Sequence, residues 1–206
     1  MQIKLVIARH NENLSWIKNI DNSNFDYQII NKGDEILLDD IPKDKIIQEV
    51  NIGREAQSYL SYIVNNYDAI KRVYDSSNWH LFTQGNPFDH YDIVELLNDS
   101  SKIALLNNHE NAKFVSLCHQ ELLCDKAGIP HHKNLNMESV WSKIFLSKIP
   151  SVFFFGAGAI LLVRNDAITA RPLSFWEKCL DATTEHDYSA HVFERIWANI
   201  FNSNVI

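Results

Sequence analysis

The sequence is poor in the residues that would place it in several special classes of protein. Its 206 residues include only three cysteines, six glycines and five prolines. The number of cysteines is odd and the chain is long, so we expect free thiols and a reducing compartment rather than a disulfide framework. The longest apolar run, over residues 152–163, is interrupted by glycine. It is also too short to span a bilayer, so no membrane-spanning segment is expected.

Basic side chains are scarce as well. Lysine and arginine total 19, aspartate and glutamate total 26, and the formal net charge is −7. Proteins that bind nucleic acid usually present a basic face, so this class is disfavoured. The acidic balance still allows a local basic pocket for a diphosphate, and a divalent metal would offset the repulsion between an acidic protein and an anionic ligand.

The residues that are abundant indicate one packed domain. Hydrophobic residues make up 46% of the chain and charged residues 22%, which is enough apolar material for a core. The length fits a single domain spanning residues 1–206, and the sequence shows no repeat, low-complexity tract or linker. Residues 1–4 lead directly into a predicted strand without the pattern of a signal peptide. We therefore expect a soluble, cytoplasmic protein.

Hydrophobic patterning predicts alternating strands and helices, with a mainly parallel sheet. Strands are predicted over 4–8, 27–30, 79–83, 152–155 and 159–163. The clearest helical periodicities cover 54–70 and 188–201. Further helices are predicted over 14–20, 92–97, 114–123 and 174–180, with irregular chain over 36–50 and 131–137.

Polar residues follow several of these strands. They occupy 9–13, 32–34 and 84–90, and a further polar segment, 51–55, opens the helix predicted over 54–70. In open α/β sheets, ligands bind at the carboxyl ends of the strands. We therefore expect these four segments to form one crevice, and their order suggests a site for a nucleotide sugar.

The segment after the first strand and the segment that opens the long helix carry groups suited to a nucleotide. Beside Arg9, the Asn11 amide both donates and accepts hydrogen bonds, which suits the edge of uracil. Asn51 and Gly53 precede free backbone N–H groups that favour a phosphate, and Arg54 can add a bidentate contact. The alternatives are an ordinary loop in which Asn11 caps a helix and a helix start with a weak surface pair between Arg54 and Glu55.

Two other segments offer ligands or a catalytic base. Asp89 and His90 are oxygen and nitrogen ligands acceptable to Mn²⁺, although a plain turn explains the same residues. Glu194 and, in reserve, Asp187 are candidate bases for an acceptor hydroxyl, and His191 could complete a metal shell. The alternative is a solvated helix face bearing His191, Glu194 and Arg195, opposite a buried stripe that includes Tyr188, Val192, Phe193, Ile196 and Trp197.

Taken together, the motifs resemble a GT-A-like glycosyltransferase family of unknown function, with similar proteins in fungi, bacteria and large algal viruses. The resemblance covers about residues 3–201. Its motifs are Ala-Arg-His-Asn-Glu at 8–12, Asn-x-Gly-Arg-Glu at 51–55, Thr-Gln-Gly-Asn-Pro-Phe-Asp-His at 83–90, Gly-Ala-Gly-Ala at 156–159 and Glu-Arg-Ile-Trp at 194–197.

This resemblance implies an α/β three-layer sandwich with a mainly parallel central sheet. It implies transfer of a sugar from a nucleotide diphosphate sugar, expected to be a UDP-sugar, to a hydroxyl of a glycan or small acceptor, assisted by Mn²⁺ or Mg²⁺. The expected donor-binding residues are Arg9, Asn11, Lys32, Asn51, Gly53, Arg54, Gln84 and Gly85, and the expected acceptor-side residues are Gly156, Ala157 and Gly158. The chain departs from the family pattern in one respect, because Gln84-Gly85-Asn86 stands where an Asp-x-Asp motif is expected.

That departure favours one rival, a non-catalytic module that binds a nucleotide sugar or a glycan. A methyltransferase would need a glycine-rich loop after the first strand, and residues 8–13 contain no glycine. A zinc site built from Cys118, Cys124, His131 and His132 matches no usual ligand spacing. A dinucleotide loop at 156–158 lacks the third glycine and the downstream acid.

Overall fold

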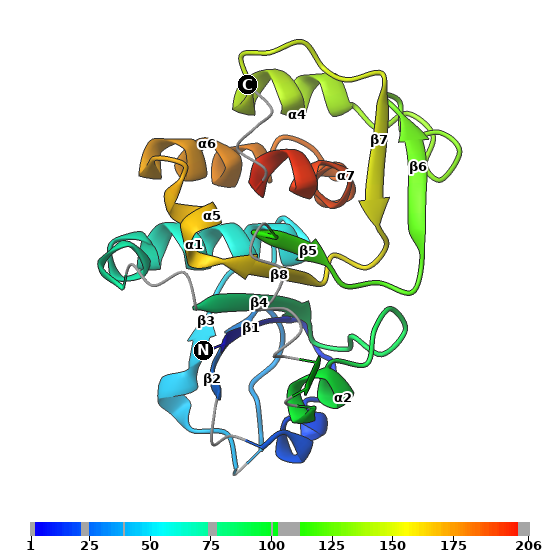
Figure 1. The fold of residues 1–206 in the computed structure, drawn as a ribbon. Coiled ribbons are helices and arrows are strands. Elements are labelled where there is room, and N and C mark those ends of the chain that lie inside the picture. Colours follow the sequence, from blue (N-terminus) through cyan, green and yellow to red (C-terminus); the bar gives the residue numbers. More distant parts are fainter. Residues whose placement is uncertain are drawn as a thin grey trace.

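The computed structural model describes residues 3–21, 25–38, 40–73, 78–99, 101–102 and 112–201. Its centre is a six-stranded sheet with the strand order β3-β2-β1-β4-β8-β5 (Figure 1). The strands are β1 (Ile3–Arg9), β2 (Phe25–Asn31), β3 (Ile46–Gln48), β4 (Trp79–Gln84), β5 (Phe114–Ser116) and β8 (Leu161–Arg164).

The central sheet is mostly parallel. β1 pairs in parallel with both β2 and β4, and β2 pairs in parallel with β3. β8 runs antiparallel to its two neighbours, β4 and β5. The predicted α/β class with a mainly parallel sheet is therefore confirmed.

The two faces of the sheet bury different sets of side chains. Successive residues of a strand point to opposite faces, so Leu5 and Ile7 of β1 join one core while Val6 and Ala8 join the other. Because both faces are covered, β1 reads as a continuous apolar run rather than an alternating one.

One face is covered by most of the helices and the other by a thinner layer. The helices on the first face are α1 (Arg54–Arg72), α4 (Met137–Ile144), α5 (Asn165–Thr169), α6 (Leu173–Ala182) and α7 (Ser189–Phe201). The second face is covered by the 3-10 helix η1 (Ser15–Asn19) and by α2 (Ile93–Asn98). A further 3-10 helix, η2 (Lys43–Lys45), leads into β3 at the edge of the sheet.

A separate two-stranded sheet stands beside α7 (Figure 1). It consists of β6 (Glu121–Asp125) and β7 (Val152–Gly156), which run antiparallel. The Gly156–Gly158 segment starts at the last residue of β7 and leads towards β8, so it connects the small sheet to the central one.

The structure corrects several predicted elements. The helix predicted over 114–123 is wrong, because this region contains β5 and the start of β6. The chain over 36–50 includes η2 and β3 rather than being irregular throughout, and α4 was not predicted. The residues of β5 and β6 pair with β8 and β7, and such distant pairing overrides local helical spacing.

Two sequence expectations concern features outside the sheet. Cys118, Cys124 and Cys179 are all free thiols, as expected. In the described part of the chain, no helix combines the length and the apolar character needed to cross a membrane.

Candidate functional site

A polar pocket of about 310 Å³, called here the first pocket, lies where the ends of β1, β2 and β4 meet the start of α1. β2 and β3 lie on one side of β1 and β4 lies on the other, so the loops after β1 and β4 diverge at this point. Open α/β sheets bind ligands at such a switch point. The lining residues are Ala8, Arg9, His10, Glu12, Lys32, Asn51, Arg54, Glu55, Ser58 and Gln84.

Arg9 ties together the loops after β1 and β2. Its Nε donates to the Glu12 carbonyl at 3.0 Å, and one terminal nitrogen donates to Asn31 Oδ1 at 2.6 Å and to the Asp34 carbonyl at 2.7 Å. Asn11 reinforces the connection, since its Oδ1 accepts from the Asp34 N–H at 2.8 Å. Arg9 therefore lines the pocket, but several of its N–H donors are already used in hydrogen bonds within the protein. Asn11 stabilises this loop and does not cap a helix.

Close backbone approach explains the glycine between these two loops. A Cβ placed on Gly33 would lie 1.6 Å from the His10 carbonyl oxygen, which is a backbone atom and cannot move aside cheaply. The Lys-Gly-Asp turn after β2 is thus required by packing against the loop after β1.

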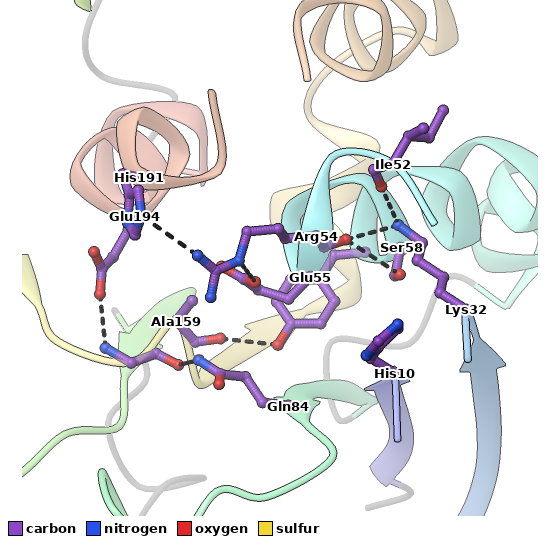
Figure 2. A network of polar contacts seen from close by, with 12 residues as sticks. His10, Lys32, Ile52, Arg54, Glu55, Ser58, Gln84, Ala159, His191 and Glu194 are labelled. Atoms are coloured by element: carbon purple, nitrogen blue, oxygen red, sulfur yellow. Dashed lines mark hydrogen bonds and ion pairs between the residues drawn. The ribbon is translucent and has the colours of Figure 1, made fainter. Parts of the chain in front are cut away.

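Lys32 connects β2 to the start of α1. Its buried Nζ donates to the carbonyl oxygens of Ile52 at 2.6 Å and Arg54 at 2.7 Å (Figure 2). Burial lowers the pKa of Lys32 to about 8, while the nearby carboxylates Glu49 and Glu55 act in the opposite direction. An ammonium group has three N–H donors, so one remains for a ligand in the first pocket.

The start of α1 has an unusual backbone. Gly53 and Arg54 both have positive φ, 62° and 52°, and the helix has no side-chain N-cap. Asn51, which precedes this start, does not cap the helix and lines the first pocket. A positive φ at a residue other than glycine is strained and persists where the surroundings impose it, often at a functional site.

This strained start brings Arg54 between two elements (Figure 2). Its Nε lies 3.6 Å from Glu55 Oε2, and a terminal nitrogen lies 3.4 Å from His191 Nε2 on α7. The Arg54 side chain remains 61% exposed, while that of Glu55 is 16% exposed. Arg54 is thus an exposed cation of the pocket lining, and Glu55 is a largely buried carboxylate of the same lining.

Glu55 has the perturbed carboxyl group of the site. Burial is the main cause that raises its pKa above the ordinary value, and the charge of Glu194 adds to this rise. Arg54 and Lys32 act in the opposite direction. Sequence reasoning gave Glu55 only a supporting role beside Arg54.

Sequence reasoning placed residues 9–13 in the crevice but gave His10 and Glu12 no role, and it left Ser58 out, although all three line the first pocket. Ser58 lies four residues after Arg54 and so shares its helix face, a spacing that could have identified it. Glu12 packs on Gly85, where a Cβ would lie 2.7 Å from Glu12 Oε2, and Trp16 Nε1 donates to the Gly85 carbonyl at 2.9 Å.

The predicted acceptor-side loop is linked to the first pocket by hydrogen bonds (Figure 2). Gln84 Nε2 donates to the Gly158 carbonyl at 2.6 Å, and the Gly158 N–H donates to Glu194 Oε1 at 2.8 Å. Tyr59 donates its hydroxyl to the Ala159 carbonyl at 3.1 Å. Gly158 thereby links Gln84, which was predicted to bind the donor, to Glu194, the predicted catalytic carboxylate.

Glu194 lines a second pocket, of about 450 Å³, together with Gly156. Its Oε2 accepts from Arg195 at 2.9 Å, so the carboxylate is held at both oxygens. Asp187, the reserve candidate, is exposed and lines neither pocket.

The predicted orientation of α7 is partly wrong. Val192, Phe193, Ile196 and Trp197 are buried as expected, but Tyr188 is 58% exposed. Arg195, expected at the solvent or the crevice mouth, is only 1% exposed. Its guanidinium lies 4.5 Å from the centre of the Phe155 ring and contacts His132 Nδ1 at 2.9 Å. The carboxylate of Glu194 and the ring of Phe155 together make this burial tolerable.

The three residues predicted as metal ligands have different surroundings. Asp89 is exposed, His90 packs against Gly158, and the His191 ring stacks on His132 at 4.3 Å. Among the residues that the structure describes, no three His, Cys, Asp or Glu side chains form a group that could hold a metal ion. These side chains therefore do not fit a preformed metal site, and metal dependence stays a prediction.

Comparisons with known proteins identify a family but no function. A family model described as "Protein of unknown function (DUF3431)" matches residues 5–206. Searches of curated proteins and of solved structures found no match.

Proposed function

The chain belongs to the DUF3431 family of proteins of unknown function, and we propose that it is a glycosyltransferase with a GT-A-like fold. It would transfer a sugar from a nucleotide diphosphate sugar, most simply a UDP-sugar, to a hydroxyl group of a glycan or small acceptor. The observation that carries this proposal is the pocket at the switch point of the sheet, whose lining has three cations, Arg9, Lys32 and Arg54, against two carboxylates, Glu12 and Glu55.

The first pocket suits a diphosphate because its cations come from three different elements. Lys32 follows β2, Arg9 ends β1 and Arg54 begins α1, so a ligand that contacts all three bridges the loops. The N-terminal end of α1 adds the partial positive charge of the helix dipole. Such groups would stabilise the charge that develops on the departing diphosphate.

We assign the second role in this reaction, that of the base that takes the proton of the acceptor hydroxyl, to Glu194. In the proposed step the acceptor oxygen bonds to the anomeric carbon of the sugar while the bond from that carbon to the diphosphate breaks. The acceptor proton passes to Glu194, whose two oxygens keep lone pairs beyond those used by Gly158 and Arg195. The link from Gln84 through Gly158 to Glu194 fixes this carboxylate relative to the first pocket.

The donor class is tested by thermal unfolding with a panel of ligands. A ligand that binds only the native state raises its stability, so UDP should raise Tm more than ADP or S-adenosylmethionine does. The panel is run with and without Mn²⁺, which tests metal dependence separately. Equal shifts with all three ligands, or none with UDP, would contradict the donor assignment.

Arg54→Ala should weaken UDP binding by about 1.5 kcal/mol, at the lower end of the range for hydrogen bonds to charged groups. The low value is expected because the Arg54 side chain is 61% exposed and partly screened. The measurement is a calorimetric titration with UDP, and the matched control is Arg72→Ala, at the exposed far end of α1. If Arg54→Ala binds UDP with wild-type affinity, Arg54 does not bind the donor and only forms a surface pair with Glu55.

A further inference from the structure

The second pocket differs from the first in chemistry. It lies among β5, the β6–β7 sheet and α7, and the Gly156–Gly158 segment stands between the two pockets. Its lining residues are Phe114, Val115, Ser116, Glu121, Phe154, Phe155, Gly156, Glu194, Trp197 and Ala198. Aromatic rings and two carboxylates dominate this set, and among the described residues that line the pocket there is no Lys, Arg or His.

The two carboxylates define which ligands the second pocket can take. Glu121 is exposed, whereas Glu194 is partly buried and its Oε2 accepts a hydrogen bond from the buried Arg195. Ionised carboxylates only accept hydrogen bonds, so they suit hydroxyl or ammonium groups and repel phosphates and other carboxylates. The first pocket, where Arg9, Lys32 and Arg54 outnumber Glu12 and Glu55, has the opposite preference.

The aromatic residues supply a flat apolar surface beside these acceptors. Phe154 lines the second pocket and is 75% exposed, an unusual degree of exposure for a large ring in a folded protein. Phe155 is buried against Arg195, which fixes its ring. Apolar rings combined with a few placed polar groups are typical of small-molecule sites, and the C–H face and hydroxyl edge of a sugar ring match this combination.

We propose that the second pocket binds the acceptor as a neutral or amino sugar ring, stacked on Phe154, with one hydroxyl directed to Glu194. This inference rests on the proposed function and specifies its acceptor class. Anionic sugars such as uronic acids are disfavoured by the carboxylate of Glu121, because the charge of Glu194 is already paired with Arg195. Glu194 belongs to this pocket and also binds the Gly158 N–H, so the acceptor hydroxyl is held next to the segment that Gln84 of the first pocket contacts.

The test uses methyl glycosides that differ only in charge. Methyl hexosides, methyl aminohexosides and methyl hexuronides in the gluco, galacto and manno configurations are titrated by saturation-transfer NMR against the UDP-loaded protein. Neutral or amino glycosides should bind, and the corresponding hexuronide should bind at least tenfold more weakly. Phe154→Ala should weaken binding at least fivefold, while Phe88→Ala, at an exposed phenylalanine outside both pockets, should not.

A charge reversal sharpens the test. Glu121→Lys changes an exposed side chain on β6, so the fold should be retained. It should weaken the amino glycoside at least fivefold and strengthen the hexuronide. Hexuronide binding equal to that of the neutral glycoside in wild type, or full binding in Phe154→Ala, would overturn the acceptor assignment.

UDP affinity measured on the same samples separates the two proposals. UDP binding without any Phe154-dependent glycoside binding overturns the acceptor assignment alone. Absence of UDP binding overturns the proposed function, and with it the acceptor role of the second pocket.

Discussion

Glu194→Gln is expected to lower sugar transfer about 10²–10⁴-fold, the usual contribution of a general base. Glutamine keeps the shape of the side chain and can still accept from the Gly158 N–H, but it cannot take the acceptor proton. UDP affinity should persist, because Glu194 lines the second pocket and not the first. The measurement is the initial rate of transfer at saturating donor.

Two controls accompany this variant. Glu177→Gln makes the same change at an exposed glutamate of α6 and should keep the wild-type rate. Glu194→Gln also removes the charge beside buried Arg195, so its Tm must be measured to separate chemistry from folding. Full activity in both Glu194→Gln and Asp187→Asn would mean that the base lies elsewhere, or that the donor phosphate takes the proton in a retaining mechanism.

Lys32→Met is expected to weaken UDP binding by about 1.5–3 kcal/mol, as for a lost hydrogen bond to a charged group. This effect should exceed that of Arg54→Ala because Lys32 is buried and less screened by water. The matched control is Lys71→Met, at an exposed lysine of the last turn of α1. Equal UDP affinities in Lys32→Met and wild type would remove Lys32 from the donor site.

The lowered pKa of Lys32 gives this prediction a pH signature. The group titrates at about 8 in the folded protein and near 10.5 when unfolded. Between these values the unfolded chain holds the extra proton, so the contribution of Lys32 to the free energy of unfolding rises with pH. UDP affinity should instead fall as pH rises through about 8, because the bound cation is lost, and this step should be absent in Lys32→Met.

From the sequence, the location of the site at one edge of the sheet could be predicted better than the role of each side chain in it. Arg9, Lys32, Asn51, Arg54 and Gln84 were all expected on the donor side, and all line the first pocket. This worked because the carboxyl ends of parallel strands meet at one edge whatever the loops contain. Which of these side chains is free for a ligand depends on contacts across loops, such as those of Arg9 with Asn31 and Asp34.

Other features needed the three-dimensional structure because no local pattern encodes them. Arg195 looks like a surface residue in sequence, but Glu194 and the Phe155 ring, which belongs to a different element, allow its burial. The aromatic second pocket was not predicted either. It depends on the pairing of β6 with β7, and the first residues of β6 were predicted to be helical.

The central claim, that the two pockets carry out sugar transfer, is tested most directly by donor turnover. Purified protein is incubated with UDP-, GDP- and dTDP-sugars, with and without Mn²⁺, and release of the nucleoside diphosphate is measured. We predict release from a UDP-sugar that is accelerated by a neutral or amino glycoside and strongly reduced in Lys32→Met and in Glu194→Gln. Tight UDP binding with no release from any donor under any of these conditions would contradict the account and identify a nucleotide-sugar-binding module instead.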